Sequence, residues 1–555
     1  MSEYLKLKPS NCKNCYKCIR HCPVKSIQFS DGQAHILPDE CILCGQCFVV
    51  CPQGAKEIRN DVGGVQGLIR SGVPVYASLA PSFVANYGVT FRAMEKALLS
   101  LGFAGVEETA LGAQLVKQRY DAMTKEGGPD VIISSCCHTI NLLIEKYHPD
   151  ALPFLAPVLS PMQAHCKRMK EEHPGAKTVF VGPCISKKAE AEESSGIVDY
   201  ALTFEELSGW LQEERVIFEN LPDDAEGAKS RLFPTTGGIL GSMDCESDGY
   251  TYMALDGVQN CMAALDDIAA GNLSHCFIEM SACPGSCVGG PVMEKTRRAP
   301  VRDYAAVHRF AGKNDLPLEP MDAKALHLDM QFKGVHKSMP GSRAIEEILR
   351  QMGKTKPEDE LNCGSCGYDT CREKAIAVYL GKADLSMCLP YLKDKAESFS
   401  DHIIQNTPNG IIVLNESLEV QQINAAARSI MNIKQESDVL GEPVVRILDP
   451  QIFFEVLGKG ISVHDKRIYL PEYHRYVEES VIYDKSYHII MCIMRDVTDE
   501  ETSKLQKEDL SRQTIEVTDK VIEKQMRAVQ EIASLLGETT AETKIALTKL
   551  KESLK

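Results

Sequence analysis

Three short segments, far apart in the sequence, place cysteines where they could hold a metal–sulfur centre. The segments are Ser135-Cys136-Cys137-His138, Gly182-Pro183-Cys184-Ile185-Ser186-Lys187-Lys188 and Ala282-Cys283-Pro284-Gly285-Ser286-Cys287. Each follows a short apolar run that predicts a strand: Val131-Ile132-Ile133, Val179-Phe180-Val181 and Phe277-Ile278. Because open α/β sheets bind ligands at the carboxyl ends of their strands, we expect the three segments to meet at one site.

Eight further cysteines near the start of the chain form two tandem C-x2-C-x2-C-x3-C-P runs. The first run holds Cys12, Cys15, Cys18 and Cys22, and the second holds Cys41, Cys44, Cys47 and Cys51. This is the pattern of bacterial two-cluster ferredoxins, in which the fourth cysteine of each run ligates the other cluster. We therefore expect Cys51 to join the first 4Fe–4S cluster and Cys22 the second. A pair of zinc sites is the alternative.

A third group of cysteines, C-x2-C-x4-C-x16-C, predicts a fourth cluster. Its members are Cys363, Cys366, Cys371 and Cys388. Four thiols within so short a stretch can close around a 4Fe–4S cubane, and a zinc site is the alternative. The stretch resembles the small 4Fe–4S domain of some redox and corrinoid proteins. We expect it to relay electrons between the middle of the chain and everything downstream.

The three segments described first resemble the active-site segments of the iron–iron hydrogenase large-subunit family. That family oxidises or produces H2 at a six-iron centre, a 4Fe–4S cluster joined through a cysteine sulfur to a two-iron unit with CO and CN ligands. The resemblance implies four cubane ligands: Cys137, Cys184, Cys283 and Cys287. It also implies that Cys287 provides the bridging sulfur.

The same resemblance implies roles for neighbouring residues. Cys136 matches the thiol that relays protons to the two-iron unit, although a buried structural thiol is the simpler alternative. Lys187 matches the lysine that binds a cyanide ligand, and Glu190 matches an acidic residue that can hold this lysine. The residues expected beside the two-iron unit are Ala80, Pro81, Ser82, Gly182, Pro183 and Ser281.

Several positions depart from the hydrogenase pattern. Ala156, Arg119 and Ala122 stand where the family's proton path has a serine and two glutamates, which puts fast turnover in doubt. Tyr120, Asp121, Glu108 or water could offer another route.

The surroundings of the expected iron centre differ as well. Gly182 and Ser281 replace methionines, which we expect to leave room for water and to add a hydroxyl donor. His138 stands where proline is usual; it either hydrogen-bonds a cubane sulfide and tunes the potential as it titrates, or merely starts a helix.

Residues 397–498 resemble a PAS domain, with Asn424 at the family's frequent asparagine. From residue 499 the chain is polar with an apolar stripe that includes Ile522, Met526 and Val529, the spacing of a helix that packs on a partner helix. Docking on the chain's own domains is the alternative. No kinase, phosphatase or DNA-binding pattern follows Thr498, so we expect any output through a separate protein.

The resulting fold class is a multidomain combination of α/β and α+β. The expected domains are a two-cluster ferredoxin module (1–62), a hydrogenase-like α/β active-site domain (65–344), a small 4Fe–4S domain (345–395), a PAS domain (397–498) and a helical or coiled-coil segment (499–555).

Composition limits the partners and the location. With 22 cysteines in 555 residues, bunched at short spacings, metal ligation is favoured over a disulfide scaffold. The net charge of −16 argues against binding nucleic acid. We see no apolar run near the roughly 20 residues of a membrane helix and no secretory signal, so we expect a cytoplasmic protein that does not enter membranes.

Three functions remain open on the sequence. The favoured one is a hydrogen- or redox-sensing hydrogenase of low turnover, in the PAS-containing sensory branch of the family. It would react with H2 and protons, exchange electrons with a ferredoxin-type carrier and signal to a kinase or phosphatase, with a homodimer also possible. The alternatives are a turnover hydrogenase linked to ferredoxin, and a non-catalytic iron–sulfur protein that lacks the two-iron unit.

Overall fold

The structure is a computed structural model of the 555-residue chain. It describes residues 4–127, 129–194, 196–222, 227–245, 249–293, 300–335 and 339–553. The chain divides into two compact units, Met1–Leu392 and Lys393–Lys555, and each is described by itself.

The ferredoxin module is built from two short antiparallel strand pairs and two short helices. Strand β1 (Leu5–Leu7) pairs with β4 (Lys56–Ile58), and β2 (Ile27–Ser30) pairs with β3 (Gln33–Ile36). Each cysteine run leads into a helix of about one turn: α1 (Lys17–Arg20) and α2 (Gln46–Val50). Tyr16 and Gly45 precede these helices with positive φ angles of 54° and 72°, which turns each loop tightly around its cysteines.

The hydrogenase-like domain contains two parallel sheets. One sheet has the order β6-β5-β8-β9, with bounds Gly105–Glu108, Val75–Leu79, Lys177–Gly182 and Tyr200–Thr203. The other has the order β10-β11-β7, with bounds Thr251–Asp256, Cys276–Ser281 and Val131–Ile133. The strands predicted before the three cysteine segments are thereby confirmed as β7, β8 and β11. Parallel sheets of this kind are covered by helices, which explains their nearly continuous apolar runs.

Helices alternate with these strands, as the α/β class requires. They are α3 (Val62–Arg70), α4 (Phe83–Tyr87), α5 (Phe91–Ser100), α6 (Ala110–Lys125), α7 (His138–Tyr147), α8 (Pro161–Glu172), α9 (Ser186–Glu193), α10 (Phe204–Glu213), α11 (Gly238–Ser242), α12 (Val258–Ala269) and α13 (Pro300–Phe310). Their starts follow the sequence closely. Thr90 caps α5, and Ser160 forms a capping box with Gln163 at α8.

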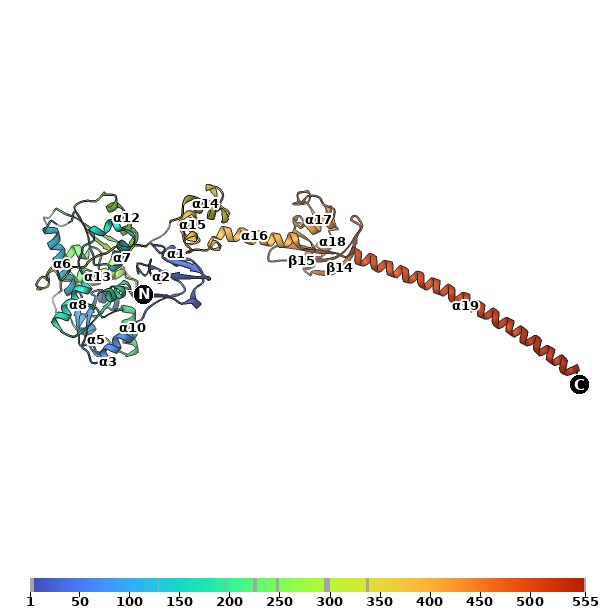
Figure 1. The fold of residues 1–555 in the computed structure, drawn as a ribbon, viewed down its shortest axis with the longest axis horizontal. Coiled ribbons are helices and arrows are strands. Elements are labelled where there is room, and N and C mark those ends of the chain that lie inside the picture. Colours follow the sequence, from blue (N-terminus) through green and yellow to red (C-terminus); the bar gives the residue numbers. More distant parts are fainter. Residues whose placement is uncertain are drawn as a thin grey trace. The chain divides into compact units, whose positions relative to one another are not determined.

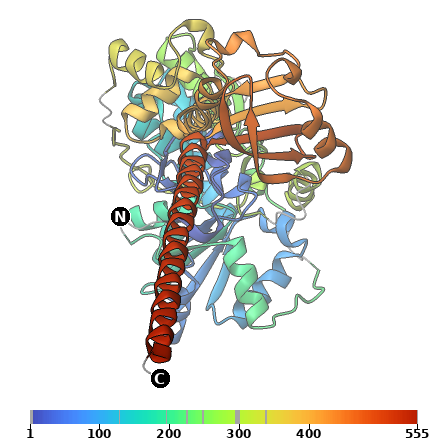
Figure 2. The ribbon, with the colours of Figure 1, turned by 90° about the vertical axis from the view of Figure 1, so that its right-hand side faces the viewer.

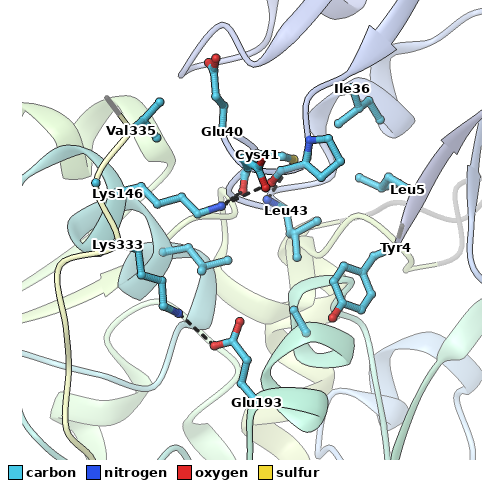
Figure 3. Close-up of a pocket in the computed structure, with 15 residues that line it drawn as sticks. Tyr4, Leu5, Ile36, Glu40, Cys41, Leu43, Lys146, Glu193, Lys333 and Val335 are labelled. Atoms are coloured by element: carbon cyan, nitrogen blue, oxygen red, sulfur yellow. Dashed lines mark hydrogen bonds and ion pairs between the residues drawn. The ribbon is translucent and has the colours of Figure 1, made fainter. Parts of the chain in front are cut away.

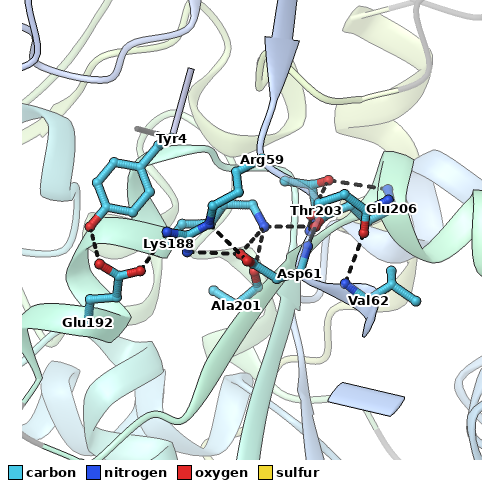
Figure 4. A network of polar contacts seen from close by, with 10 residues as sticks. Tyr4, Arg59, Asp61, Val62, Lys188, Glu192, Ala201, Thr203 and Glu206 are labelled. Atoms are coloured by element: carbon cyan, nitrogen blue, oxygen red, sulfur yellow. Dashed lines mark hydrogen bonds and ion pairs between the residues drawn. The ribbon is translucent and has the colours of Figure 1, made fainter. Parts of the chain in front are cut away.

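A buried ion-pair network fixes α9 to the segment that leaves the ferredoxin module (Figure 4). The fully buried Lys188 donates to Asp61 and to Glu206, each at 2.8 Å, and to the carbonyl of Ala201 at 3.0 Å. Glu206 in turn accepts from the backbone N–H of Asp61 at 2.6 Å. The charge of Lys188 is thus paired, as burial requires, and these contacts fix α9 to Asp61 and to α10.

The small cysteine domain contains α14 (Ser342–Gln351) and α15 (Cys371–Tyr379), and belongs to the first unit. Helix α16 (Leu389–Asn406) begins directly after Cys388 (Figure 1). The expected boundary between residues 395 and 397 therefore falls inside a helix, and the division into compact units comes slightly earlier, at Leu392.

The second unit contains a five-stranded antiparallel sheet in the order β13-β12-β16-β15-β14, which Figure 2 shows with its strands side by side. The strands are Val420–Ile423, Gly410–Asn415, Ile489–Asp496, Arg475–Asp484 and Val463–Leu470, and the helices are α17 (Ala425–Ile430) and α18 (Gln451–Lys459). Asn424 caps α17 at Ala427 and also accepts from the N–H of Ile411 at 2.8 Å, so it ties the helix to the sheet.

A single long helix, α19 (Thr498–Ser553), follows the sheet (Figure 1). The predicted helical stripe is present, and Ile522, Met526 and Val529 are 54–60% exposed. The last two residues of the predicted segment, 554–555, lie outside the described residues. None of the described helices combines the length and the apolarity needed to cross a membrane.

Candidate active site and its electron-transfer surroundings

The carboxyl ends of strands from both parallel sheets bring four cysteines together. Cys137 follows β7, Cys184 follows β8, and Cys283 and Cys287 follow β11. Burial raises the pKa of the Cys283 thiol, and the nearby sulfurs of Cys184, Cys137 and Cys287 raise it further. Four thiols this close to one another could serve as the four ligands of a 4Fe–4S cubane.

The loop after Cys287 packs closely on the loop before Cys184. A Cβ atom added at Gly290 would lie 2.7 Å from the carbonyl oxygen of Pro183, closer than side-chain atoms normally approach. Gly285 has a φ of 79°, which favours glycine between the two cysteines of this segment. The absence of a side chain at Gly290 lets two ligand loops from different sheets pack directly on each other.

Lys187 points from the start of α9 toward the Cys136–Cys137 segment. Its Nζ donates to the carbonyl of Cys136 at 3.2 Å and forms a buried ion pair with Glu190. Burial alone would lower the pKa of Lys187, but the Glu190 carboxylate outweighs it and the pKa is raised. The lysine therefore stays charged, and its neighbour Lys188 is committed to the network on the other side of the helix.

The thiol of Cys136 contacts a buried tyrosine. Tyr120 on α6 is fully buried, and its hydroxyl lies 3.3 Å from the Cys136 sulfur and 3.0 Å from the hydroxyl of Ser135. The hydroxyl of Ser135 donates to the carbonyl of Val158 at 2.7 Å. Burial raises the pKa of Cys136 to about 12, so its thiol holds a proton.

The other side chains considered for a proton route form ion pairs with other residues. Asp121 pairs with Lys117 at 3.1 Å, and Glu108 holds Arg231. Arg119 pairs with Glu126, pointing out of the core. Of the three side chains weighed from the sequence as substitutes, Tyr120 is the one that contacts Cys136.

Glu279 is a polar group near Cys136 that sequence reasoning missed. It lies in β11, is 2% exposed, and accepts from the N–H groups of Gly237 at 2.9 Å and Leu240 at 3.1 Å. Burial raises its pKa to about 7, and its charge raises the pKa of Cys136. The available signal was a lone glutamate inside the apolar strand Cys276–Ser281, where an unpaired charge is costly.

Two hydroxyls and an imidazole nitrogen near the cysteines are buried without a protein partner. Ser82, Ser281 and His138 each leave one such atom without a hydrogen bond within the part of the chain that the structure describes. Buried polar atoms normally have partners. Together with four thiols and the charged Lys187, these orphans fit a bulky polar group with anionic ligands.

One expectation about these surroundings is wrong, and the structure bears on a second. A Cβ atom at Gly182 would lie 2.5 Å from the ring of Phe180 and 3.2 Å from Ala80, so the ring fills the room expected for water on that side. His138 is buried, and burial lowers its pKa to about 3. His138 is the first residue of α7, as one of the two alternatives expected, and among the described residues its buried Nε2 has no hydrogen-bond partner.

Several ferredoxin cysteines lie near one another as expected, and the place of Cys51 in the first group stays a prediction. Cys22, at the end of the first run, is near Cys41, Cys44 and Cys47, and its sulfur raises the pKa of each of them. Cys18 is instead near Cys12 and Cys15.

The second group also borders the active site. Cys44 is near enough to raise the pKa of Cys283. A Cβ atom added at Gly45 would lie 2.6 Å from Pro291 and 2.9 Å from Ile185, residues of the two active-site loops.

A cavity of about 810 Å³ lies where the ferredoxin module faces α7 and α9 (Figure 3). Lys146 donates to the carbonyl of Cys41 at 2.8 Å, and Lys333 pairs with Glu193 at 3.0 Å on its wall. The cavity borders the second ferredoxin group and is not lined by the four active-site cysteines. The candidate active site is therefore the four-cysteine site, which offers ligands for iron, and not this cavity.

Family comparisons agree with these modules. Residues 73–248 and 241–291 match the model described as iron only hydrogenase large subunit, C-terminal domain. Residues 4–52 match a 4Fe-4S dicluster domain, residues 359–390 an Fe-S cluster model and residues 398–497 the PAS fold. The chain thus combines an iron-only hydrogenase large-subunit domain with a dicluster ferredoxin domain and a PAS domain.

Individual relatives are distant. The chain is 27% identical over 389 residues to the periplasmic [Fe] hydrogenase large subunit of Nitratidesulfovibrio vulgaris, which covers 55% of this chain and 91% of that protein. It is 24% identical over 274 residues to iron hydrogenase 1 of Clostridium pasteurianum, a match that covers 39% of this chain and 48% of that protein. It is also 27% identical over 161 residues to the cytosolic Fe-S cluster assembly factor NAR1 of Kluyveromyces lactis, a match that covers 27% of this chain and 34% of that protein.

Among solved structures, a variant of the [FeFe]-hydrogenase HydA1 from Chlamydomonas reinhardtii is similar to half of this chain. The match covers 50% of this chain and 100% of that chain, with 19% identity and a TM-score of 0.40.

Proposed function

We propose that this protein is a hydrogen- or redox-sensing hydrogenase of low turnover, which reacts reversibly with H2 and passes the resulting signal toward its PAS domain. The observation that carries the proposal is the convergence of Cys137, Cys184, Cys283 and Cys287 beside a buried, charged Lys187 and a protonated Cys136. When bound, the six-iron centre supplies the cleavage of H2 into two protons and two electrons.

The chain's own residues would bind and orient that centre. The four thiols would hold the cubane, and Cys287 is the one that would also serve the two-iron unit. Lys187, kept charged by Glu190, offers a buried cation to an anionic ligand, which would provide the counter-charge that burial requires. The hydroxyls of Ser82, after β5, and of Ser281, at the end of β11, would offer hydrogen bonds to that centre.

Proton exchange would begin at Cys136. Its thiol is placed to give up and receive a proton as a general acid and base, with Tyr120 as its hydrogen-bond neighbour. Glu279, whose pKa is raised to about 7 by burial, is a buried acid of suitable strength to exchange that proton near neutral pH. Because Ala156 is apolar and Arg119 points outward, this route replaces the usual one, and we expect turnover to be slow.

The appended modules favour a sensor over an enzyme of metabolism. A ferredoxin-type carrier would exchange electrons with the eight-cysteine module. The cluster of residues 363–388 would bias α16 and the PAS domain, and α19 would present the output to a separate kinase or phosphatase, as a monomer or a homodimer. Order–disorder and helix shifts of such elements are common switching devices.

Infrared spectroscopy of artificially matured, full-length protein tests the proposal. We expect CO and CN stretching bands that change when argon is replaced by H2, with low H2 uptake on a dye acceptor. If the matured protein shows no such bands, the proposal is lost. Uptake at the rate of metabolic hydrogenases would favour the turnover alternative.

A non-catalytic iron–sulfur protein remains the second candidate, favoured by the similarity to the assembly factor NAR1. In that case Cys136 and the Lys187–Glu190 pair would have no ligand to serve. Iron counting after maturation separates the two: four cubanes alone support the second candidate, and four cubanes plus two further irons support the sensor.

A further inference from the structure

The small cysteine domain is bound directly to the ferredoxin module. The guanidinium of Arg20 donates to the carbonyl of Gly364 at 3.0 and 3.2 Å and to that of Ser365 at 3.3 Å. Gly364 and Ser365 are the two residues between Cys363 and Cys366. Arg20 lies between Cys18 and Cys22, which belong to the two different ferredoxin groups. One side chain therefore links the first ligand loop of the small domain to the ligand segment shared by both ferredoxin groups.

A second row of contacts extends this interface. Lys25 donates to the carbonyl of Gly367 at 3.2 Å and lies 3.6 Å from the carboxylate of Asp369. Farther along, the N–H of Phe29 donates to the carbonyl of Lys382 at 2.7 Å, and the Lys382 side chain pairs with Glu40. The latter ion pair is largely buried, so it differs from an ordinary surface pair.

Close packing seals the same surface. A Cβ atom added at Gly367 would lie 3.1 Å from both the side chain of Ile19 and the carbonyl of Tyr16. Ile19 is fully buried and Tyr368 is 3% exposed. The two belong to one apolar cluster that includes Cys22 and Cys366. An interface with a shared apolar core and a polar rim fixes two parts of a chain more firmly than a linker can.

Another part of the ferredoxin module contacts the active site. There, Gly45 packs on Pro291 and Ile185, and Cys44 is near Cys283. The module thus lies between the four active-site cysteines and the small domain, although the small domain follows the hydrogenase-like domain in sequence.

We propose that the ferredoxin module is the middle of an internal electron path, and that the cluster of residues 363–388 exchanges electrons with it across the Arg20 interface. This inference rests on the proposed function for its source of electrons, since H2 cleavage would supply two electrons that leave one at a time. Each transfer oxidises one cubane by one electron and reduces the next by one, and no bond or proton changes. A soluble carrier then competes with the small domain for the same electrons.

Magnetic coupling between reduced clusters tests the path without using H2. Full-length protein is reduced with dithionite and compared with a Cys363→Ser/Cys366→Ser variant by electron paramagnetic resonance. We expect the ferredoxin signals of the native chain to show broadening and faster relaxation that are lost in the variant, while iron content falls by one cubane. Identical ferredoxin signals in the two proteins would overturn the inference.

Charge reversal at the interface gives the second readout. Arg20→Glu places a carboxylate against the carbonyls of Gly364 and Ser365, and we expect the coupling to be lost with all clusters retained. Lys13→Glu makes the same charge change on an exposed residue of the same module and should leave the coupling intact. Equal coupling in both variants would contradict the proposal.

With H2 as reductant, the Arg20→Glu variant should lose reduction of the small-domain cluster and keep reduction of the active-site cubane. Undiminished reduction of the small-domain cluster in this variant would show another route. If the native protein fails to react with H2, the proposed function fails, yet the dithionite comparison still decides whether the two cluster-bearing parts communicate.

Discussion

The two sides of the candidate active site differ in how well they connect to the rest of the molecule. On the electron side, Gly45 packs directly on the side chains of Ile185 and Pro291, which belong to the loops of Cys184 and Cys287. On the proton side, Cys136 contacts Tyr120, and the hydrogen bonds continue through Ser135 to the carbonyl of Val158, which carries no exchangeable proton.

This difference indicates which function the site suits. Under the proposed function, electrons would reach the ferredoxin module through this direct packing. A proton would instead have to pass buried groups, of which the acid, Glu279, is only 2% exposed. A site that reports its redox state readily but releases protons slowly suits a detector better than an enzyme of high flux.

Removing the thiol of Cys136 should have the largest effect on the proton side. We expect Cys136→Ala to lower H2 turnover by about 100-fold or more, the usual contribution of a general acid or base, while cubane content stays unchanged. The measurement is dye-linked H2 uptake with iron counting. Cys166→Ala, which alters a buried cysteine of α8 outside the site, serves as the control. An unchanged rate in Cys136→Ala would remove this residue from the mechanism.

The adjacent lysines offer a matched pair of substitutions. Lys187→Met leaves Glu190 buried without its cation, and Lys188→Met does the same to Glu206, while Asp61 keeps its pair with Arg59. Breaking a buried pair typically costs about 3–5 kcal/mol, so both variants should unfold at lower temperature.

Only Lys187→Met should also change the CO and CN bands of the matured protein, because only Lys187 points toward Cys136. Infrared spectra of the two variants at equal iron content make the comparison. Equal spectral changes in both would mean that Lys187 acts through stability alone.

Much of this arrangement could be predicted from the sequence because it depends on local signals. The apolar runs before Cys137, Cys184 and Cys283 form strands, and the start of α5 follows its capping residue Thr90. The grouping of Cys22 with the second ferredoxin run follows from spacing alone.

What the sequence could not show depends on contacts between distant segments. The ring of Phe180 occupies the space beside Gly182, which no local pattern reveals. The placement of the small domain on Arg20 joins residues more than 340 positions apart. Glu279 could be noticed as a charge in an apolar strand, but its proximity to Cys136 comes from the pairing of β11 with β7.

A milder change on the proton side should follow from Tyr120→Phe. This substitution removes the hydroxyl that contacts Cys136 and accepts from the N–H of Ser135 at 2.9 Å, leaving that buried N–H without a partner. The unsatisfied group should cost about 1–3 kcal/mol of stability. Turnover should fall less than in Cys136→Ala, with cluster content unchanged. A rate equal to that of the native protein would show that the Tyr120 hydroxyl takes no part in proton exchange at Cys136, which water would then have to provide.

The last effect we expect is a pH dependence set by Glu279, which needs no substitution to be seen. Burial raises its pKa in the folded protein to about 7, above the 4.5 of an unperturbed carboxyl, so the folded state binds its proton more tightly. This contribution to stability is present at low pH and is lost as the pH rises from about 4.5 to about 7, a total of about 3 kcal/mol. Infrared difference spectra should show a protonated carboxyl band that disappears with a midpoint near pH 7 and is absent in Glu279→Gln. A midpoint near 4.5 would show that Glu279 is ionised at neutral pH, and the proton side would then have no buried acid poised to serve Cys136.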